Sequence, residues 1–428
     1  MHYFRDFKSF RDARIDLLRQ PLTILIGPNG SGKTNALEAI EVLSTIASGR
    51  HLHEIADLGK RAAINVRGGL QGCVRRGSDT FLLSFTARIR WQRRVRGIRY
   101  SVSVKPRPEP RIASESLWLT NDDTMLFETL GTDSPSSADI RVQYNNFAQG
   151  GRKPQASASA TRSALSQYEQ FAVKNRMLDA SLRPISALRR HLAASFVFDP
   201  KPHVSRGYER IGDTVLRRDG SNLSSVLFGL QSNGLERREI LDSLFEFIRH
   251  VPEEPYSEFK FIETPAGDVM LGLRERGSDA PTDARILSDG TLRSLAVLTA
   301  VATSPEGSRV VVEEFDNGLH PSRVSALVAA VADMGDRRSV NVVLTTHNPV
   351  TLDSLTEDQQ QGVVVAFRSL KDGSSQLRRL VNLPRHDELL ERGTLGGLVT
   401  RRIIDQYVGD DIDQIRAKRM RQWVEARG

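Results

Sequence analysis

Residues 27–34 read GPNGSGKT and place glycines, a lysine and a threonine at the spacing G-x-x-x-x-G-K-T. Glycines let the backbone approach an anion closely, so that successive N–H groups can point at it. Lys33 supplies a positive charge for the terminal phosphates of a nucleotide, and the Thr34 hydroxyl is a ligand for Mg²⁺. We therefore predict a phosphate-binding loop for ATP and Mg²⁺ rather than a glycine-rich turn with a chance lysine. Its residues are Gly27, Pro28, Asn29, Gly30, Ser31, Gly32, Lys33 and Thr34.

Two adjacent carboxylates follow a short apolar run in residues 309–314, RVVVEE. In a site that hydrolyses a nucleotide, one acid holds Mg²⁺ through water and a second acid polarises the attacking water. We predict the metal role for Glu313 and the general-base role for Glu314. Aspartate is the usual residue at the first position, so Glu313 departs from the pattern. Considered alone, the pair would more simply be an acidic strand end that faces solvent, and the phosphate loop is what favours catalysis.

Two further segments complete the candidate groups. Residues 287–301, LSDGTLRSLAVLTAV, place a Ser-x-Gly turn before a helical pattern, so that a hydroxyl and backbone N–H groups lie at a positive helix end. Residues 342–355, VVLTTHNPVTLDSL, place His347 at a strand end, where it could contact a γ-phosphate or the attacking water. A histidine before Asn-Pro is by itself more often a turn residue. The order of all four segments favours the catalytic interpretation.

The elements that must position these groups follow from hydrophobic periodicity. Residues 22–27 predict a buried strand before the loop, and residues 34–47 predict a helix after it. Helices and strands alternate again near the end of the chain, at 288–303 (helix), 309–315 (strand), 321–334 (helix) and 340–346 (strand). Such alternation predicts a mainly parallel sheet with helices on its faces.

The middle of the chain is less regular. Residues 81–104 alternate apolar and polar side chains around a basic turn, which predicts an antiparallel hairpin. Residues 106–160 carry clusters of Pro, Ser, Gly and Asp, which predict loops with short strands. Residues 161–250 predict mostly helices, and the segments FKFIET and VMLGLRE predict a pair of strands.

Composition limits the class of protein. The chain has 428 residues, of which 39% are hydrophobic, enough for a large core. Cys73 is the only cysteine, so no intramolecular disulfide can form. The N-terminus lacks the apolar core of a signal peptide, and no run approaches the roughly 18 apolar residues of a membrane helix. We therefore expect a soluble, cytoplasmic protein without a membrane partner.

The formal net charge of +8 is a modest excess that suggests an anionic partner. The densest basic cluster is RIRWQRRVRGIR, residues 88–99. If DNA binds, we expect its phosphates to contact this hairpin. A solvated hairpin without a ligand is an equally open alternative. The arginines of the cluster are Arg88, Arg90, Arg93, Arg94, Arg96 and Arg99.

The ordered set of phosphate loop, SDG helix, double-glutamate strand and THN strand resembles the ATP-binding-cassette ATPases of the SMC, RecF and OLD type, especially compact AAA-like members. The resemblance covers roughly residues 1–100 and 270–360, and includes the opening FKSFRDARIDL and Asn35 after the loop. It implies a signature motif, two Walker B acids, a D-loop region and a switch histidine. The signature motif would be Ser288, Asp289 and Gly290, and the Walker B acids would be Glu313 and Glu314. The D-loop region would be residues 317–320, and the switch histidine would be His347.

The resemblance also implies a Q-loop, for which Gln71 in RGGLQG is the candidate and an expected metal ligand beside Thr34 and Glu313. The implied fold is α/β, a P-loop NTPase of the ABC-ATPase head type with a mixed or parallel central sheet, an antiparallel β-lobe and a largely helical insertion. The expected divisions are 1–105 and 271–360 for the two parts of the head, 106–270 for the insertion and 361–428 for a C-terminal extension.

In such ATPases two chains share each ATP, which implies a homodimer or higher homo-oligomer. Ser288 and Gly290 of one chain would meet the ATP held by Lys33 of another chain. His320 would then lie near the interface. An equally open alternative is that His320 neighbours the N-cap before Pro321 opens the next helix.

Absent features narrow the function further. The sequence has no sustained heptad repeats, so it does not predict a long coiled-coil arm. The residues after His347 contain no acidic cluster that would form a nuclease centre, so a nuclease or toxin effector would be a separate chain. The leading hypothesis is an ATPase whose nucleotide-dependent dimerisation senses or clamps DNA, or controls such an effector, in anti-phage defence or DNA repair. The assignment to defence rests on family analogy alone.

Two other hypotheses belong to different classes. One is a regulatory or scaffold ATP-binding protein with very slow turnover that holds a toxin or nuclease partner inactive. The other, an ABC transporter subunit, fits the large insertion and the RecF-like opening poorly.

Overall fold

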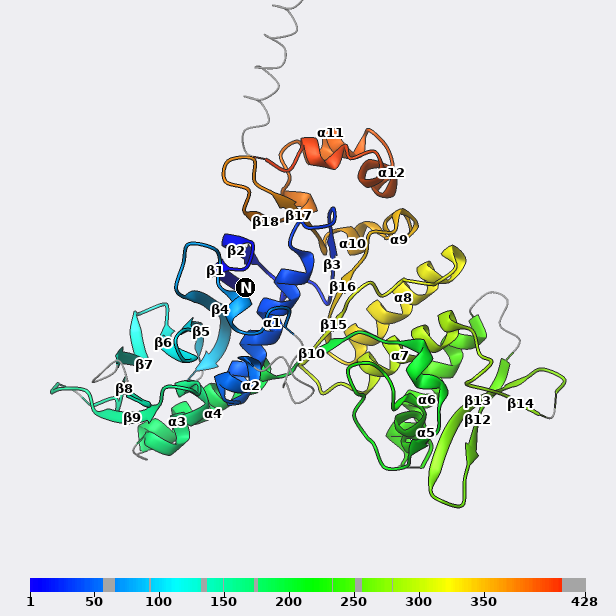
Figure 1. Ribbon diagram of the computed structural model, residues 1–428, viewed down its shortest axis with the longest axis horizontal. Coiled ribbons are helices and arrows are strands. Elements are labelled where there is room, and N and C mark those ends of the chain that lie inside the picture. The colour runs from blue at the N-terminus through cyan, green and yellow to red at the C-terminus, as the bar shows by residue number, and fades with distance from the viewer. Residues whose placement is uncertain are drawn as a thin grey trace, which may run out of the picture. The chain divides into compact units, whose positions relative to one another are not determined.

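The structure, a computed structural model, describes residues 1–56, 66–91, 94–131, 137–148, 150–172, 176–232, 234–250, 256–278 and 280–409. The chain forms two compact units, each with its own strands and helices (Figure 1). Unit 1 comprises Met1–Leu17, Gly30–Ser195 and Lys371–Leu377, and unit 2 comprises Leu18–Asn29, Phe196–Leu370 and Arg378–Gly428. Within the described part of the chain, no helix combines the length and the apolar character needed to cross a membrane.

Unit 1 is built on an eight-stranded sheet in the order β2-β1-β4-β5-β6-β7-β8-β9, in which every neighbouring pair is antiparallel. Its strands are β1 (His2–Phe7), β2 (Phe10–Ile15), β4 (Phe81–Trp91), β5 (Arg94–Lys105), β6 (Arg111–Leu119), β7 (Thr124–Gly131), β8 (Asp139–Tyr144) and β9 (Gln155–Ser159). Successive side chains of a strand point to opposite faces. Ile98, Tyr100 and Val102 of β5 are therefore buried on one face, while the residues between them are more exposed.

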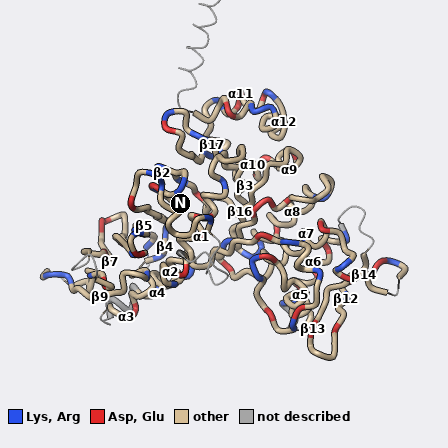
Figure 2. The backbone as a smooth tube through the Cα atoms, in the orientation of Figure 1, with Lys and Arg blue, Asp and Glu red and all other residues tan. Residues whose placement is uncertain are grey.

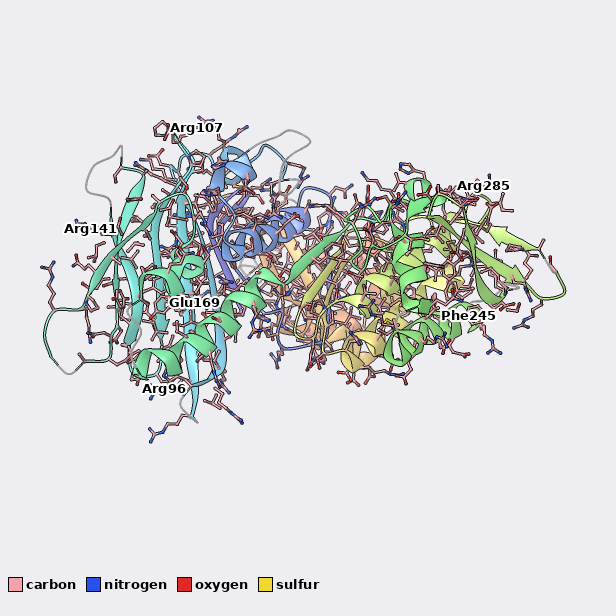
Figure 3. The ribbon with its side chains drawn as sticks, turned by 90° about the horizontal axis from the view of Figure 1, so that it is seen from below. Arg96, Arg107, Arg141, Glu169, Phe245 and Arg285 are labelled. Atoms are coloured by element: carbon pink, nitrogen blue, oxygen red, sulfur yellow. The ribbon has the colours of Figure 1, made fainter. Side chains whose placement is uncertain are left out.

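Helices cover the buried face of this sheet. They are α1 (Lys33–Ser48), α2 (Leu52–Ala56), α3 (Ala164–Phe171) and α4 (Arg176–Ala193). The ring of Phe85 on β4 lies 5.4 Å from the ring of His191 on α4. The carboxylate of Glu115, buried on β6, accepts the backbone N–H groups of Ala164 and Leu165 at the start of α3. Figure 3 shows α3, marked by Glu169, lying over the sheet.

The predictions for this unit were partly correct. The hairpin is confirmed, because β4 and β5 pair from Phe81 opposite Val104 to Trp91 opposite Arg94. The opening strand pair is also confirmed by β1 and β2. The loops with short strands predicted for residues 106–160 understated the regular structure, since these residues add the four strands β6 to β9 to the sheet. Their polar clusters lie largely in the turns, and the strands depend on cross-strand neighbours that local spacing does not reveal.

A second sheet has the order β10-β15-β16-β3-β17-β18, and its parallel strands β15, β16, β3 and β17 lie in unit 2. The strands are β3 (Leu22–Ile26), β10 (Ser195–Phe198), β15 (Arg309–Val312), β16 (Asn341–Thr345), β17 (Val363–Arg368) and β18 (Ser375–Arg379). Every residue of β3 and β15 is buried, as expected for parallel strands covered on both faces. The predicted mainly parallel sheet is confirmed.

Helices and a smaller sheet surround these strands in unit 2. The helices are α5 (Leu223–Ser232), α6 (Leu235–His250), α7 (Asp289–Thr303), α8 (Pro321–Arg337), α9 (Pro349–Asp353), α10 (Glu357–Gln360), α11 (His386–Leu390) and α12 (Leu395–Thr400). The smaller sheet contains β11 (Glu209–Arg210), β12 (Tyr256–Glu263), β13 (Asp268–Glu275) and β14 (Pro281–Asp283). β12 and β13 are the predicted strand pair and are antiparallel. Leu295 of α7 and Val328 of α8 join Ile24 of β3 in one hydrophobic core.

Three predictions for unit 2 need correction. The strand predicted at 309–315 ends at Val312, so both glutamates follow it. The mostly helical segment 161–250 also contains β10, β11 and the short 3-10 helix Pro202–Arg206. The predicted C-terminal extension begins with β17, which pairs with β3 inside the central sheet. Residues 410–428 of the predicted extension lie outside the described residues.

Candidate nucleotide site

Three of the four candidate segments leave the central sheet of unit 2 at the same edge. Val312 of β15, Leu344 of β16 and Ile24 of β3 are register partners in parallel strands. The loops that follow these strands therefore emerge together, and they begin with Gly27–Asn29, with Glu313 and Glu314, and with Thr346 and His347. Ligands of open α/β sheets bind outside the carboxyl ends of the strands. The sequence-predicted carboxylates, histidine and phosphate-loop entry thus share that position.

The backbone of Glu314 is held in a strained conformation, with φ of 46°. Its N–H donates to the Thr345 hydroxyl at 2.9 Å, and its carbonyl oxygen accepts from the Arg293 guanidinium at 2.8 Å. Strained non-glycine residues cluster at functional sites, where the surroundings over-determine them. The side chain of Glu314 is 52% exposed, and its Oε1 lies 3.9 Å from Nδ1 of His347.

A buried carboxylate that the sequence interpretation did not single out lies two residues after Glu314 in the chain. Asp316 is 6% exposed and accepts hydrogen bonds from the hydroxyls of Thr346, at 2.6 Å, and Thr351. Thr346 directly precedes His347. Thr351 lies on α9, which begins two residues after His347. Asp316 therefore connects the loop after β15 with the loop after β16. The signal in the sequence was the Thr-Thr dipeptide before the histidine, which is informative only once the partner is known.

The Ser-x-Gly turn caps a helix as predicted. The Ser288 side chain accepts the N–H of Thr291 at 3.0 Å and forms the N-cap of α7. A Cβ atom on Gly290 would lie 3.2 Å from the Leu319 side chain, so this position has little room for a larger residue. Asp289 forms an ion pair with Arg206 at 2.5 Å.

Arg293, one turn into α7, links the helix that Ser288 caps to the loop after β15. Besides the Glu314 carbonyl, its guanidinium donates to the Pro200 carbonyl at 2.9 Å. Burial lowers the pKa of Arg293, although an arginine remains protonated at neutral pH. A shift of α7 would therefore pull directly on the backbone of Glu314. The sequence offered no signal for this contact, because 21 residues separate the two partners.

The second half of the phosphate loop lies in unit 1 and opens α1. Gly32 is the N-cap of α1 with φ of 110°, a left-handed conformation that favours glycine. A Cβ atom there would also lie 2.5 Å from the Ser375 hydroxyl, which excludes any side chain without rearrangement. Lys33 and Thr34 follow as the first helical residues. Their position at a positive helix end suits a bound anion.

Polar contacts fix the first turns of α1. The Asn35 side chain donates to the Ser9 hydroxyl at 2.6 Å and accepts from Arg67 at 3.2 Å. One turn later, the buried Glu38 carboxylate receives Lys8 at 2.7 Å and Arg67 at 3.1 Å. Burial alone would raise the pKa of Glu38, but the hydrogen bonds from Arg67 and Lys8 outweigh it and hold the pKa below its usual value.

Gln71, the candidate Q-loop residue, lies in the short 3-10 helix Gln71–Cys73 of unit 1. Its side-chain oxygen accepts from two guanidinium nitrogens of Arg107, at 3.0 and 3.2 Å. Figure 3 shows Arg107 at the end of the sheet opposite Arg96. A metal-bound Gln71 would have to exchange this partner, so its role as a ligand stays a prediction.

The expected metal ligands are all oxygen donors, which is the set that Mg²⁺ prefers. Among the described residues, no cluster of three or more His, Cys, Asp and Glu could hold a metal ion by itself. Mg²⁺ is commonly bound through one or two protein ligands, substrate phosphates and water. Thr34, Glu313 and Gln71 fit that chemistry as separate donors.

His320 is one residue for which the sequence left two roles open. In the structure it is the N-cap of α8, and its Nδ1 accepts the N–H of Ser322 at 3.3 Å. Pro321 occupies the first helical position, as the capping alternative expected.

Comparisons with known proteins agree with these features. The family model described as "AAA domain, putative AbiEii toxin, Type IV TA system" matches residues 22–353. A DNA replication and repair protein RecF from Pseudarthrobacter chlorophenolicus is 31% identical over 251 residues, which cover 52% of this chain and 59% of that protein. A RecF protein from Synechococcus sp. is 48% identical over 48 residues, or 11% of this chain and 12% of that protein. The matched segments thus span less than two thirds of these relatives.

Among solved structures, an SMC head bound to the C-winged helix domain of ScpA has a TM-score of 0.46 and 14% identity. It covers 88% of this chain and 96% of that chain.

Proposed function

This chain belongs to the AAA_21 family of AAA-domain proteins, an SMC- and RecF-like class of ABC-type ATPases, and from that premise we propose that it binds and hydrolyses ATP with Mg²⁺. The observation that supports hydrolysis best is the common edge of β3, β15 and β16, from which the phosphate loop, the two glutamates and the histidine emerge.

Each side chain has a distinct task in this proposal. Lys33 binds the terminal phosphates, and Thr34 and Glu313 supply oxygen ligands to the metal. Glu314 accepts a proton from the attacking water, which its exposed carboxylate can reach from the sheet edge. His347 orients the same water or contacts the γ-phosphate. Mg²⁺, when bound, neutralises the charge that develops on the phosphate oxygens.

The proposal includes a shared active site in a homodimer. Ser288 caps α7 and Gly290 follows it, so hydroxyl and backbone donors lie at the helix end where an anion would be favoured. We expect these donors to bind the ATP of a partner chain. ATP binding at this end of α7 would then affect Glu314 of the same chain, because the Arg293 guanidinium donates a hydrogen bond to the Glu314 carbonyl.

Mixing two inactive variants tests the shared site. Lys33→Ala should prevent ATP binding in one chain, and Ser288→Arg should block the signature contact from the other. Each variant should be inactive alone, whereas a mixed dimer keeps one intact composite site and should regain part of the activity. If mixed dimers form and no activity returns, the simple shared site is wrong.

The biological task we propose is nucleotide-dependent sensing or clamping of DNA, or control of a separate nuclease or toxin chain. The name of the RecF relatives supports DNA repair, while the defence role rests on family analogy. Turnover measured with and without DNA tests the coupling, and DNA should raise the rate.

One departure favours the regulatory alternative. Glu313 is longer than the usual aspartate, which changes the distance available to a metal-bound water. Very slow turnover that DNA does not change, together with tight ATP binding, would support a scaffold that holds a partner inactive.

A further inference from the structure

The arginines of the β4–β5 hairpin divide between the two faces of the unit 1 sheet. Residues directly opposite each other in an antiparallel pair share a face. Arg88 lies opposite Gly97, Arg90 opposite Val95, and Arg99 opposite Thr86, which puts all three arginines on the face away from the helices. Their side chains are exposed.

The remaining described arginines of the cluster belong to the other face. Arg94 lies opposite Trp91, which is buried and whose ring lies 6.3 Å from that of Phe147. Arg96 forms an ion pair with Asp122 at 2.5 Å. Its charge is therefore already compensated within the protein. Arg93, which the sequence grouped with these, lies outside the described residues.

Neighbouring strands extend the positive charge of the first face. Tyr3 and Arg5 of β1 lie opposite Ser84 and Leu82 of β4, and Arg14 of β2 lies opposite Tyr3. Side chains alternate between the two faces along β5, so Lys105 lies on the same face as Arg99. We call this surface the basic face. Its cations are Arg5, Arg14, Arg88, Arg90, Arg99 and Lys105, and Figure 2 shows the charged residues along the backbone.

Little on the protein neutralises the basic face. Among the register-paired residues of β1, β2, β4 and β5, Asp12 is the one carboxylate on this side, and the next is Glu128 of β7, opposite Ser116 and two strands away from β5. No hydrogen bond or ion pair joins the guanidinium groups of Arg88, Arg90 or Arg99 to any residue that the structure describes. Ser101 lies between Arg99 and Lys105 along β5, and Ser116 lies opposite it on β6, so both add hydroxyl donors beside the cations. Unpaired cations with hydroxyls nearby are the groups that contact phosphates in protein–DNA complexes.

We propose that the basic face binds the phosphate backbone of double-stranded DNA. This inference rests on the proposed DNA-dependent function and names the surface that performs it. A duplex fits better than a single strand, because single strands are held by aromatic rings on which bases stack. Strands β1, β2 and β4 to β6 place two aromatic rings on this face. The ring of Tyr3 already contacts the guanidinium groups of Arg5 at 5.6 Å and Arg14 at 5.5 Å, and Trp118, opposite Arg99, is half-buried. Contact with phosphates alone would be independent of base sequence.

The two faces of one hairpin provide a matched pair of variants. Arg88→Gln with Arg90→Gln removes two charges from the basic face, and Arg94→Gln with Arg96→Gln removes two from the opposite face. Each phosphate contact contributes about 0.9 to the slope of log K against log salt concentration for duplex DNA. The first variant should therefore bind more weakly and lower that slope by about 2. The second should keep a slope close to that of the wild type.

The experiment uses the full chain with ATP and a fluorescent duplex of unrelated sequence, titrated at several salt concentrations. Thermal unfolding and ATP binding confirm that both variants are folded. If the wild type does not bind duplex DNA, the DNA part of the proposed function is wrong. If the wild type binds and both variants lose the same affinity, or neither loses any, the basic face is wrong while DNA binding stands. Tighter binding of a matched single strand that depends on Arg88 and Arg90 would overturn the choice of a duplex.

Discussion

The two sheets of this protein bury their strands in different ways. β3 and β15 of unit 2 are buried at every residue, and their polar groups appear only after the strand ends. β5 of unit 1 alternates between buried and more exposed residues along much of its length. A parallel sheet covered on both faces leaves only its edge for chemistry, whereas an antiparallel sheet covered on one face leaves a whole surface for binding.

We expect this difference to give the two regions different tasks. At the edge of unit 2, a strained Glu314 backbone is held by Thr345 and Arg293, which suits a reaction that needs precise positions. On the open face of unit 1, charges are spread over several strands and suit an extended anion. Mutations at the edge should therefore change turnover, and mutations on the open face should change DNA affinity.

The largest effect is expected for Lys33→Ala, which removes the charge that faces the phosphates. Nucleotide binding or turnover should be lost, because the anion is then under-compensated. Isothermal titration and a phosphate-release assay measure both quantities. Lys260→Ala is a control, since Lys260 pairs with the exposed Glu258 on β12. Unchanged affinity and rate in Lys33→Ala would reject the phosphate loop.

Glu314→Gln should have the next largest effect, because it keeps the shape of the side chain and removes the base. We expect ATP binding to persist and hydrolysis to slow by roughly 100-fold or more. An ATP-bound dimer should accumulate, which light scattering can detect. Glu313→Gln is the matched comparison. If it slows turnover more and leaves Mg²⁺ affinity intact, the roles of the two glutamates are reversed.

Arg293→Met should lower turnover by about tenfold, equivalent to about 1.4 kcal/mol of transition-state stabilisation. The substitution removes the side-chain donor to the Glu314 carbonyl, leaves the hydrogen bonds to Thr345 and from the Asn317 N–H in place, and does not alter the phosphate loop. The rate at saturating ATP should fall while ATP affinity stays the same. Arg285→Met is the control, because Arg285, labelled in Figure 3, forms an ion pair with Asp283 at the surface. A loss of ATP affinity instead would show that Arg293 supports binding rather than the position of Glu314.

The smallest effect concerns stability and pH in unit 1. A folded-state pKa below the usual value means that ionised Glu38 stabilises the fold above that value. The stabilisation is lost as pH falls through the folded-state pKa. Glu38→Gln should lower the Tm at pH 7, and its difference from the wild type should shrink below the usual carboxyl pKa of 4.5. Glu306→Gln, at an exposed site in unit 2, should show no such trend; a constant Tm difference for Glu38→Gln would contradict this account.

Several features could be predicted from the sequence because they depend on residues close together in the chain. The strand, loop and helix around GPNGSGKT have continuous apolar runs and a motif of fixed spacing, and β3 and α1 agree with the prediction to within a residue or two. The capping of α7 by Ser288 follows from a turn of three residues. The order of the four segments was sufficient to indicate the family.

Only the tertiary structure decided which residues meet across the chain. Residues 106–160 contain strands because β6 pairs with the edge of β5, and each of β7, β8 and β9 pairs with the strand before it. Arg293 and Glu314, or Asp316 and Thr346, come together through the packing of elements distant in sequence. The alternation of the hairpin divides its arginines into two sets, but the helices packed on the sheet determine which set faces solvent. The spacing of apolar residues in the sequence shows that side chains alternate along a strand. Packing against other elements determines which of the two faces is buried and which is exposed.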